Sequence, residues 1–195
     1  MAERLPRLLP ADLDEAQRHL YDLLVSGPRQ GGPVPLTGAD GQLEGPFNAM
    51  LFAPGTGAPL LGLGTAVRFG SSLAPRVREI ATLAIAAHSG SEYELYAHER
   101  LGRQAGLTAA ECAALRGQQD PGLADPGEQA VLRVTRRLLD GGDIPDDLYR
   151  AAERALGPAG LVELVTLAGY YLTLAMLMRT FRVGAPEPGQ AAPPS

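Results

Sequence analysis

The chain has 195 residues, of which 45% are hydrophobic and 20% are charged, and these values are typical of one soluble globular domain with a substantial core. The formal net charge is −5 and the basic residues are scattered, which argues against nucleic acid or an anionic membrane as a partner. A small anionic ligand stays compatible, because one or two arginines suffice to bind it. The single cysteine, Cys112, cannot form an internal disulfide, so we expect a reducing compartment, the cytoplasm.

Two segments bear on targeting. The N-terminal residues include early acids and no long apolar run, so we expect no signal peptide. Residues 161–178 are apolar and about long enough to span a membrane. They contain Glu163 and two tyrosines, however, and stand alone among amphipathic neighbours, so we expect a buried central or interface helix and no membrane.

Helix signals dominate the chain and strand alternation is nearly absent, which predicts an all-α fold. A capping box at Asp12 and Glu15 predicts a first helix that ends near residue 26. The Gly- and Pro-rich residues 27–59 are expected to form a long loop, in which residues 45–52 are compatible with a short helical turn. Such a loop is usually functional or packed over another part of the protein. We expect one domain over residues 1–183 and a disordered tail over residues 184–195. The other helices are predicted at residues 58–70, 75–88, 91–106, from 108 onward, 125–141, 145–156 and 159–181.

Four residues in the middle of the chain could form one site: Glu79, Ser91, Glu94 and His98. Ser91 and Glu94 follow Gly90 and fit a structural capping box, in which each side chain satisfies a backbone N–H. Glu94 also lies four residues before His98, so the two side chains share a helix face. Both a capping and a catalytic role are therefore open for Glu94.

His98 is the strongest candidate for chemistry, because imidazole can accept and return a proton near neutral pH. Glu79 lies in an apolar run, and a buried carboxylate there would need a partner. It could orient His98 or pair with Arg76 or Arg78; alternatively, it is an exposed residue that balances those arginines. The sequence contains no Gly-rich phosphate loop and no His or Cys pair spaced for a metal.

Further side chains are candidates for binding a substrate. Arg68 and Arg76 could bind a carboxylate, since the guanidinium fork matches its geometry, although each could equally be a solvated surface arginine. Ser91 and Tyr93 could contact a substrate, and Tyr93 could equally be a core residue. The same two possibilities apply to the other tyrosines near these helices, Tyr96, Tyr170 and Tyr171.

The spacing of the four residues resembles the frame Glu-x11-Cys-x2-Cys-x3-His of the carboxymuconolactone decarboxylase / alkylhydroperoxidase-D-like superfamily, with Ser91 and Glu94 in the cysteine positions. The resemblance covers roughly residues 45–183. It is carried also by the segments RFGSSL (68–73), PRVRE (75–79), AH (97–98), AGLT (105–108), GPFN (45–48) and GYY (169–171).

This resemblance implies an all-α, alkylhydroperoxidase-D-like subunit in an intertwined homo-oligomer, a trimer or a hexamer, with a site near subunit contacts. It implies a decarboxylase-like subgroup that needs no metal or organic cofactor, with His98, Glu79 and Glu94 as catalytic residues. Because Ser91 and Glu94 cannot do thiol chemistry, the peroxidase activity of the superfamily is not expected.

Three functions stay open. The first is a cofactor-free lyase, isomerase or cyclase that acts on a small carboxylated or enolisable molecule. The second is a non-catalytic ligand-binding or assembly protein on the same scaffold, and the third is a redox protein that uses Cys112 or a partner's thiol. A pocket with His98, Glu79 and an arginine would favour the first, a filled core around His98 the second, and an exposed, activated Cys112 the third.

Overall fold

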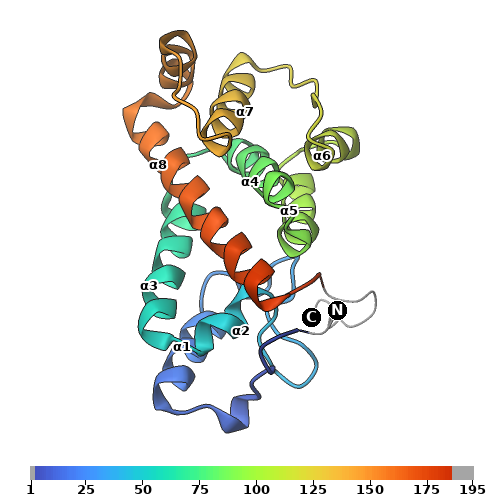
Figure 1. Ribbon diagram of the computed structural model, residues 1–195, viewed down its shortest axis with the longest axis vertical. Coiled ribbons are helices and arrows are strands. Elements are labelled where there is room, and N and C mark those ends of the chain that lie inside the picture. The colour runs from blue at the N-terminus through green and yellow to red at the C-terminus, as the bar shows by residue number, and fades with distance from the viewer. Residues whose placement is uncertain (1–2, 186–195) are drawn as a thin grey trace.

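The computed structural model describes residues 3–185, in which the regular elements are all helices apart from one isolated bridge between Thr37 and Leu43. This confirms the all-α prediction. Figure 1 shows α8 running diagonally across the molecule, with α4 and α5 beside its middle and α1 and α2 beyond its C-terminal end. In chain order the elements are η1 (Pro10–Asp12), α1 (Glu15–Val25), α2 (Pro46–Leu51), α3 (Pro54–Thr65), η2 (Ala66–Gly70), α4 (Pro75–Ser89), α5 (Glu92–Gln104), α6 (Ala109–Arg116), α7 (Pro126–Leu139) and α8 (Asp146–Phe181).

The helical hairpin of α4 and α5 forms the centre of the fold. Its turn is made by Gly90, whose φ of 63° and ψ of 32° are left-handed values that glycine adopts without strain. Residues 79–87 of α4 are all buried, because α4 packs against α5, α6, α7 and α8. A side chain on this helix therefore faces other helices and little water.

α8 combines the two helices predicted at 145–156 and 159–181. Gly157 has a non-helical φ of 67° and ψ of 172°, so the chain turns there before Pro158 begins the apolar part. α8 is long and apolar enough to cross a membrane, but the core helices of soluble proteins also meet these two criteria. The acidic residue in the apolar part of α8 has a structural partner, since Glu163 accepts hydrogen bonds from the backbone N–H and the hydroxyl of Ser72 at 2.9 and 2.7 Å.

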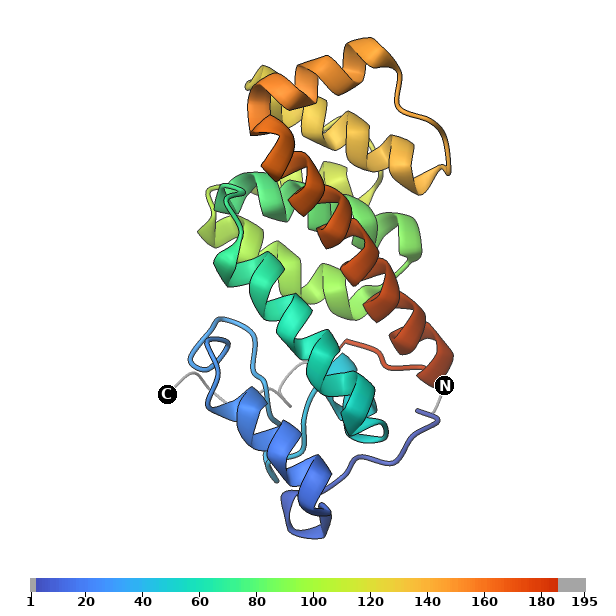
Figure 2. The ribbon, with the colours of Figure 1, turned by 90° about the vertical axis from the view of Figure 1, so that its left-hand side faces the viewer.

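The N-terminal third differs from the prediction in two places. The capping box of α1 is formed by Asp14 and Gln17, not by Asp12 and Glu15, because Asp12 is part of the short turn η1. The predicted loop to residue 59 ends earlier, since α2 begins at Pro46 and α3 at Pro54, where proline fits the first turn of a helix. Figure 2 shows the remaining loop, in light blue, between α1 and α2. Of the expected disordered tail, residues 186–195 lie outside the described residues.

The π-helical segment η2 follows α3 directly and contains Arg68 and Phe69. Such wider turns are rare and occur often at functional sites, because they redirect the side chains that follow. η2 packs against α8 as well as α3. This places Arg68 between these helices and the long loop.

Candidate functional site

His98 is held between two carboxylates. Its Nδ1 atom lies 2.6 Å from Oε2 of Glu79 on α4, and its Nε2 atom lies 3.2 Å from Oε2 of Glu94 on α5. All three side chains are at most 5% exposed. The structure therefore brings together the three residues that the sequence suggested for catalysis, in the order Glu79, His98, Glu94.

This arrangement favours the charged forms of His98 and Glu79. Burial alone would lower the pKa of His98, but the charges and hydrogen bonds of Glu79 and Glu94 outweigh it and raise that pKa above its ordinary value of 6.5. Burial likewise opposes ionisation of Glu79, but His98, Arg68 and Arg78 hold its pKa below the ordinary value. Arg78 contributes a charge at 3.7 Å from Glu79. The contact of His98 with Glu79 thus favours an imidazolium beside a carboxylate.

The predicted capping box of Ser91 and Glu94 is wrong. Ser91 is the residue before α5, but its hydroxyl makes no capping hydrogen bond and is buried without a partner among the described residues. Its backbone N–H is already bound to the carbonyl of Ala86, at 3.0 Å. The carboxylate of Glu94 turns to His98 instead, where a charged partner gives a stronger hydrogen bond.

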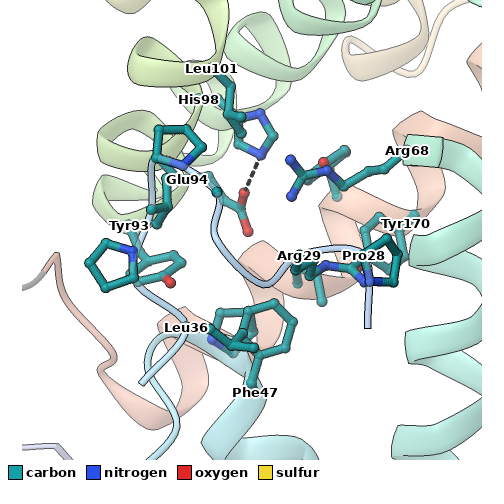
Figure 3. A pocket seen from close by; sticks show the side chains of 18 of the residues that line it. Pro28, Arg29, Leu36, Phe47, Arg68, Tyr93, Glu94, His98, Leu101 and Tyr170 are labelled. Atoms are coloured by element: carbon teal, nitrogen blue, oxygen red, sulfur yellow. Dashed lines mark ion pairs between the residues drawn. The ribbon is translucent and has the colours of Figure 1, made fainter. Parts of the chain in front are cut away.

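Glu94 and His98 line a partly enclosed cavity of about 160 Å³. Figure 3 shows them on one side of it, with Arg68 opposite and the long loop passing in front. The lining residues come from the long loop, α2, η2, α5 and α8: Pro28, Arg29, Gly32, Pro33, Val34, Pro35, Leu36, Pro46, Phe47, Arg68, Phe69, Tyr93, Glu94, Ala97, His98, Leu101, Tyr170, Tyr171 and Leu174. Most of these side chains are apolar, as is typical of small-molecule sites. Glu79 is not among them and lies behind His98.

The tyrosines shape the cavity from two sides. The ring of Tyr171 packs edge-on against His98, with centroids 4.9 Å apart, and Tyr170 packs against Tyr171. Tyr93 is 4% exposed, and its ring lies so close to Gly45 that a Cβ there would overlap it. Tyr96 is not a lining residue and stacks with Arg100 outside the cavity, at 3.7 Å.

The two candidate arginines lie in different places. Arg68 lines the cavity, where Tyr171, Glu79 and Glu94 outweigh the cost of burial and raise its pKa. Arg76 lies away from the cavity and binds Glu111 and Glu128, with shortest N–O distances of 2.5 and 2.7 Å. Its guanidinium also donates to the carbonyl of Gly106. The ion pairs with Glu111 and Glu128 join the start of α4 to α6 and α7. Arg76 therefore has a structural role, and we leave it out of the site.

Arg29 was missed by the sequence reasoning and also lines the cavity, as do the neighbouring loop residues and Phe47. The only sequence signal was the length of the Gly- and Pro-rich loop, which does fold over another part of the protein. Nothing in the local sequence distinguishes Arg29 from a solvated arginine. It could be recognised only when the loop was placed against η2 and α8.

Cys112 lies outside the cavity in a separate apolar cluster with Ile80 and Leu83. It is 5% exposed, and burial raises the pKa of its thiol, so it lacks the features of a reactive cysteine. Within residues 3–185 no three His, Cys, Asp or Glu side chains are arranged to hold a metal ion.

Comparisons with known proteins agree with this architecture. Residues 54–137, which include the frame from Glu79 to His98, match the model of the carboxymuconolactone decarboxylase family. This match supports the resemblance of the chain to the carboxymuconolactone decarboxylase / alkylhydroperoxidase-D-like superfamily. No curated protein matches its sequence.

Solved structures show the same fold at low sequence identity. An alkylhydroperoxidase AhpD core, an uncharacterized peroxidase-related protein from Ralstonia eutropha JMP134, has a TM-score of 0.74 and 12% identity, over 95% of this chain and 93% of that one. A cysteine-to-alanine variant of the debrominase Bmp8, in complex with 2,3,4-tribromopyrrole, has a TM-score of 0.70 and 10% identity, over 96% and 94%. ATU0492 from Agrobacterium tumefaciens, described as a putative antioxidant defence protein, has a TM-score of 0.62 and 19% identity, over 72% and 97%.

Proposed function

We propose that this protein is a cytoplasmic enzyme that performs acid–base chemistry, without an organic cofactor or a metal, on a small carboxylated or enolisable molecule. The reaction would be that of a decarboxylase or another lyase, or of an isomerase or cyclase. The observation that carries the proposal is the chain Glu79–His98–Glu94, of which His98 and Glu94 line a cavity that Arg68 also lines. Proton transfer requires a titratable group in reach of the substrate, and His98 and Glu94 are such groups in this cavity.

In a decarboxylation, the electrons of the broken carbon–carbon bond would move into a conjugated carbonyl group as CO₂ leaves. Arg68 would stabilise the negative charge on that oxygen, and the imidazolium of His98 would give the carbon a proton. In an isomerisation, Glu94 would remove a proton from one carbon and return it to another. Glu79 lies behind the imidazole, so its role would be to orient His98 and to support its charge.

Thiol peroxidase activity has no support in this site. Reduction of a peroxide needs a thiolate, whereas the cavity is lined by Glu94 where the superfamily frame has a cysteine. The sole thiol, Cys112, is buried elsewhere. A debrominase and peroxidase-related proteins share the fold, but with 10 to 19% identity they indicate architecture and not reaction.

We also propose a homo-oligomer, a trimer or a hexamer. The outer face of α8 carries Val162, Val165 and Met176, which are 68%, 49% and 51% exposed. These residues lie on one side of the helix, because the intervals of three and eleven residues correspond to about one and three turns. An exposed apolar stripe of this kind is typical of a protein–protein interface.

The test is a search for turnover in D₂O, followed by ¹H NMR. Unsaturated lactone carboxylates and β-keto acids would report a lyase through loss of the carboxyl group, and enolisable carbonyl compounds would report an isomerase through deuterium incorporation. Turnover that Glu94→Gln and His98→Gln both abolish would support the proposal. A substrate that both variants convert at the wild-type rate would refute the proposal. A ligand that binds in the wild-type cavity but is not chemically converted in any assay would favour the binding-protein alternative.

A further inference from the structure

Arg29 has an unused hydrogen-bonding edge inside the cavity. Its Nη1 atom donates to the hydroxyl of Thr65 at 3.1 Å. Its Nε and Nη2 atoms are buried, and neither makes a hydrogen bond of normal geometry within residues 3–185, although the Tyr170 hydroxyl is close enough to raise the pKa of Arg29. Nε and Nη2 form one edge of the planar guanidinium, and that edge binds both oxygens of a carboxylate in a bidentate pair. The free edge therefore has the shape of a carboxylate site.

The charge of Arg29 is also not balanced by an acidic side chain. Arg76 has Glu111 and Glu128 as partners, and Arg7 has Glu3 and Glu44. For Arg29 the structure shows no ion pair with a described residue, only the rings of Phe47 and Phe69, 5.7 and 5.5 Å from the guanidinium carbon.

The surroundings of Arg29 make this imbalance costly. Burial lowers its pKa, and the nearby cation Arg68 lowers it further, although the Tyr170 hydroxyl acts in the opposite direction. Arg68 itself has the carboxylates of Glu79 and Glu94 near it. Arg29 is partly buried, and a cation in such a place without a counter-charge is unusual in proteins, because desolvation of a charge is expensive unless a partner compensates.

We infer that Arg29 binds the carboxylate of a small, flat, unsaturated or aromatic acid, held by the Nε–Nη2 edge and facing the Glu94–His98 side of the cavity. The aromatic and aliphatic walls suit a flat body: Phe47, Phe69 and Leu36 line the cavity together with several prolines. Figure 3 shows Arg29 between Phe47 and Arg68, on the far side of the cavity from His98. This inference rests on the proposed function for the reaction, but the binding that it describes needs no turnover.

The assignment also explains why the loop lies over the cavity. Arg29 follows α1 and Gly27, and the next residues of the loop, up to Leu36, cover the same cavity. A substrate carboxylate bound to Arg29 would supply the missing counter-charge and so would hold this loop in place. The acid–base pair, which comes from α5, is carried by the rigid centre of the fold. Binding and chemistry would thus be divided between the loop and the helical core.

The experiment measures binding of benzoate and of its neutral isostere benzamide by calorimetry or NMR titration at low salt. We expect wild type to prefer benzoate. Arg29→Gln should weaken benzoate about tenfold to a hundredfold, the range for loss of a charged hydrogen bond, and leave benzamide nearly unchanged. Arg29→Lys should give an intermediate loss, because it keeps the charge without the fork. Arg133→Gln is the matched control, since Arg133 is an exposed arginine on α7.

Stability gives a second measurement. If Arg29 serves a ligand, its replacement removes a partly buried charge that has no counter-charge, so the Tm of Arg29→Gln without ligand should equal or exceed that of wild type. Equal affinity of wild type for benzoate and benzamide, no measurable benzoate binding, or unchanged benzoate affinity in Arg29→Gln would each overturn the inference. If Arg29→Gln does not fold, Arg29→Lys decides by the same comparison of the two ligands. Failure of the proposed function would appear separately, as turnover that survives His98→Gln.

Discussion

Glu94 lies one helical turn before His98 on α5, and its Oε2 atom is 3.2 Å from Nε2 of the imidazole, at the wall of the cavity. In the superfamily frame this position belongs to a cysteine. A carboxylate here can accept and release a proton but cannot form a disulfide, so the substitution changes the chemistry that the scaffold allows. The second carboxylate, Glu79, binds the opposite nitrogen of the same ring.

Glu94→Gln and His98→Gln should both lower kcat by about 10²- to 10⁴-fold, the usual contribution of general acid–base catalysis. Their stabilities should differ. His98→Gln leaves Glu79 and Glu94 buried without the cation between them, and the loss of one member of a buried ion pair typically costs about 3–5 kcal/mol. We therefore expect a clear fall in Tm for His98→Gln, measured by calorimetry, alongside the fall in activity.

The double variant Glu79→Gln/His98→Gln separates the two effects. It removes one buried negative charge together with the cation, so part of the lost stability should return while activity stays low. Near-full activity in His98→Gln would show instead that the histidine is purely structural.

The pH dependence should follow the charge of His98. Its pKa is raised above 6.5 in the folded protein, because Glu79 and Glu94 outweigh the effect of burial. Its contribution to stability is therefore fully present below pH 6.5 and is lost as the pH rises through the folded pKa. Any activity that needs the imidazolium should decline over the same range.

Glu79→Gln should move this decline to lower pH, since it removes the strongest interaction that raises the pKa of His98. The pKa can be measured directly from the ring nitrogens of His98 by ¹⁵N NMR, and compared with a pH–rate profile. Glu99→Gln is the control, because Glu99 is on the same helix as His98, α5, but binds Arg116 away from the cavity. An unchanged His98 titration in Glu79→Gln would contradict the electrostatic account.

Local sequence was sufficient for most of the helical boundaries. Gly90, Thr108 with Glu111, Asp125 and Gly157 each act at a helix end through their own backbone or side chain, and the structure has helix ends at those residues. The capping box at Ser91 failed because other interactions compete for the same groups. The bond from Ser91 to Ala86 belongs to the preceding turn, and Glu94 is attracted by a histidine whose charge depends on Glu79 of another helix.

The same distinction applies to the site. The Glu79–His98 contact could be anticipated from the spacing of the superfamily frame, which carries information about a tertiary contact. The choice between Arg68 and Arg76 as the arginine of the site could not be anticipated, because Arg68 precedes α4 and Arg76 is in its first turn. Only the packing of η2 against α8 and of α6 against α4 places the two side chains in different surroundings. Arg29 depends on a loop whose path is set by contacts distant in sequence.

Hydroperoxide reduction with a dithiol reductant should be undetectable, and Cys112→Ser should change neither this result nor any lyase or isomerase activity. The thiol is 5% exposed and burial raises its pKa, so little thiolate is present or accessible. A coupled peroxidase assay over pH 6 to 9 makes the measurement. Turnover that disappears in Cys112→Ser would instead establish the redox function, and turnover that survives it would show that our view of Ser91 and Glu94 is wrong.

The exposed stripe of α8 should form a subunit contact. Val162 and Val165 are one turn apart on the outer face of the helix and are 68% and 49% exposed. Replacing both with glutamate would place charges where a partner's apolar surface must pack, so the oligomer should dissociate while the subunit keeps its helical content, because neither side chain is in the core. Light scattering after size exclusion would report the mass, and Ala113→Glu, at an exposed position on α6, is the control. A wild-type monomer at micromolar concentration, or a multimer unaffected by the double substitution, would remove α8 as the interface.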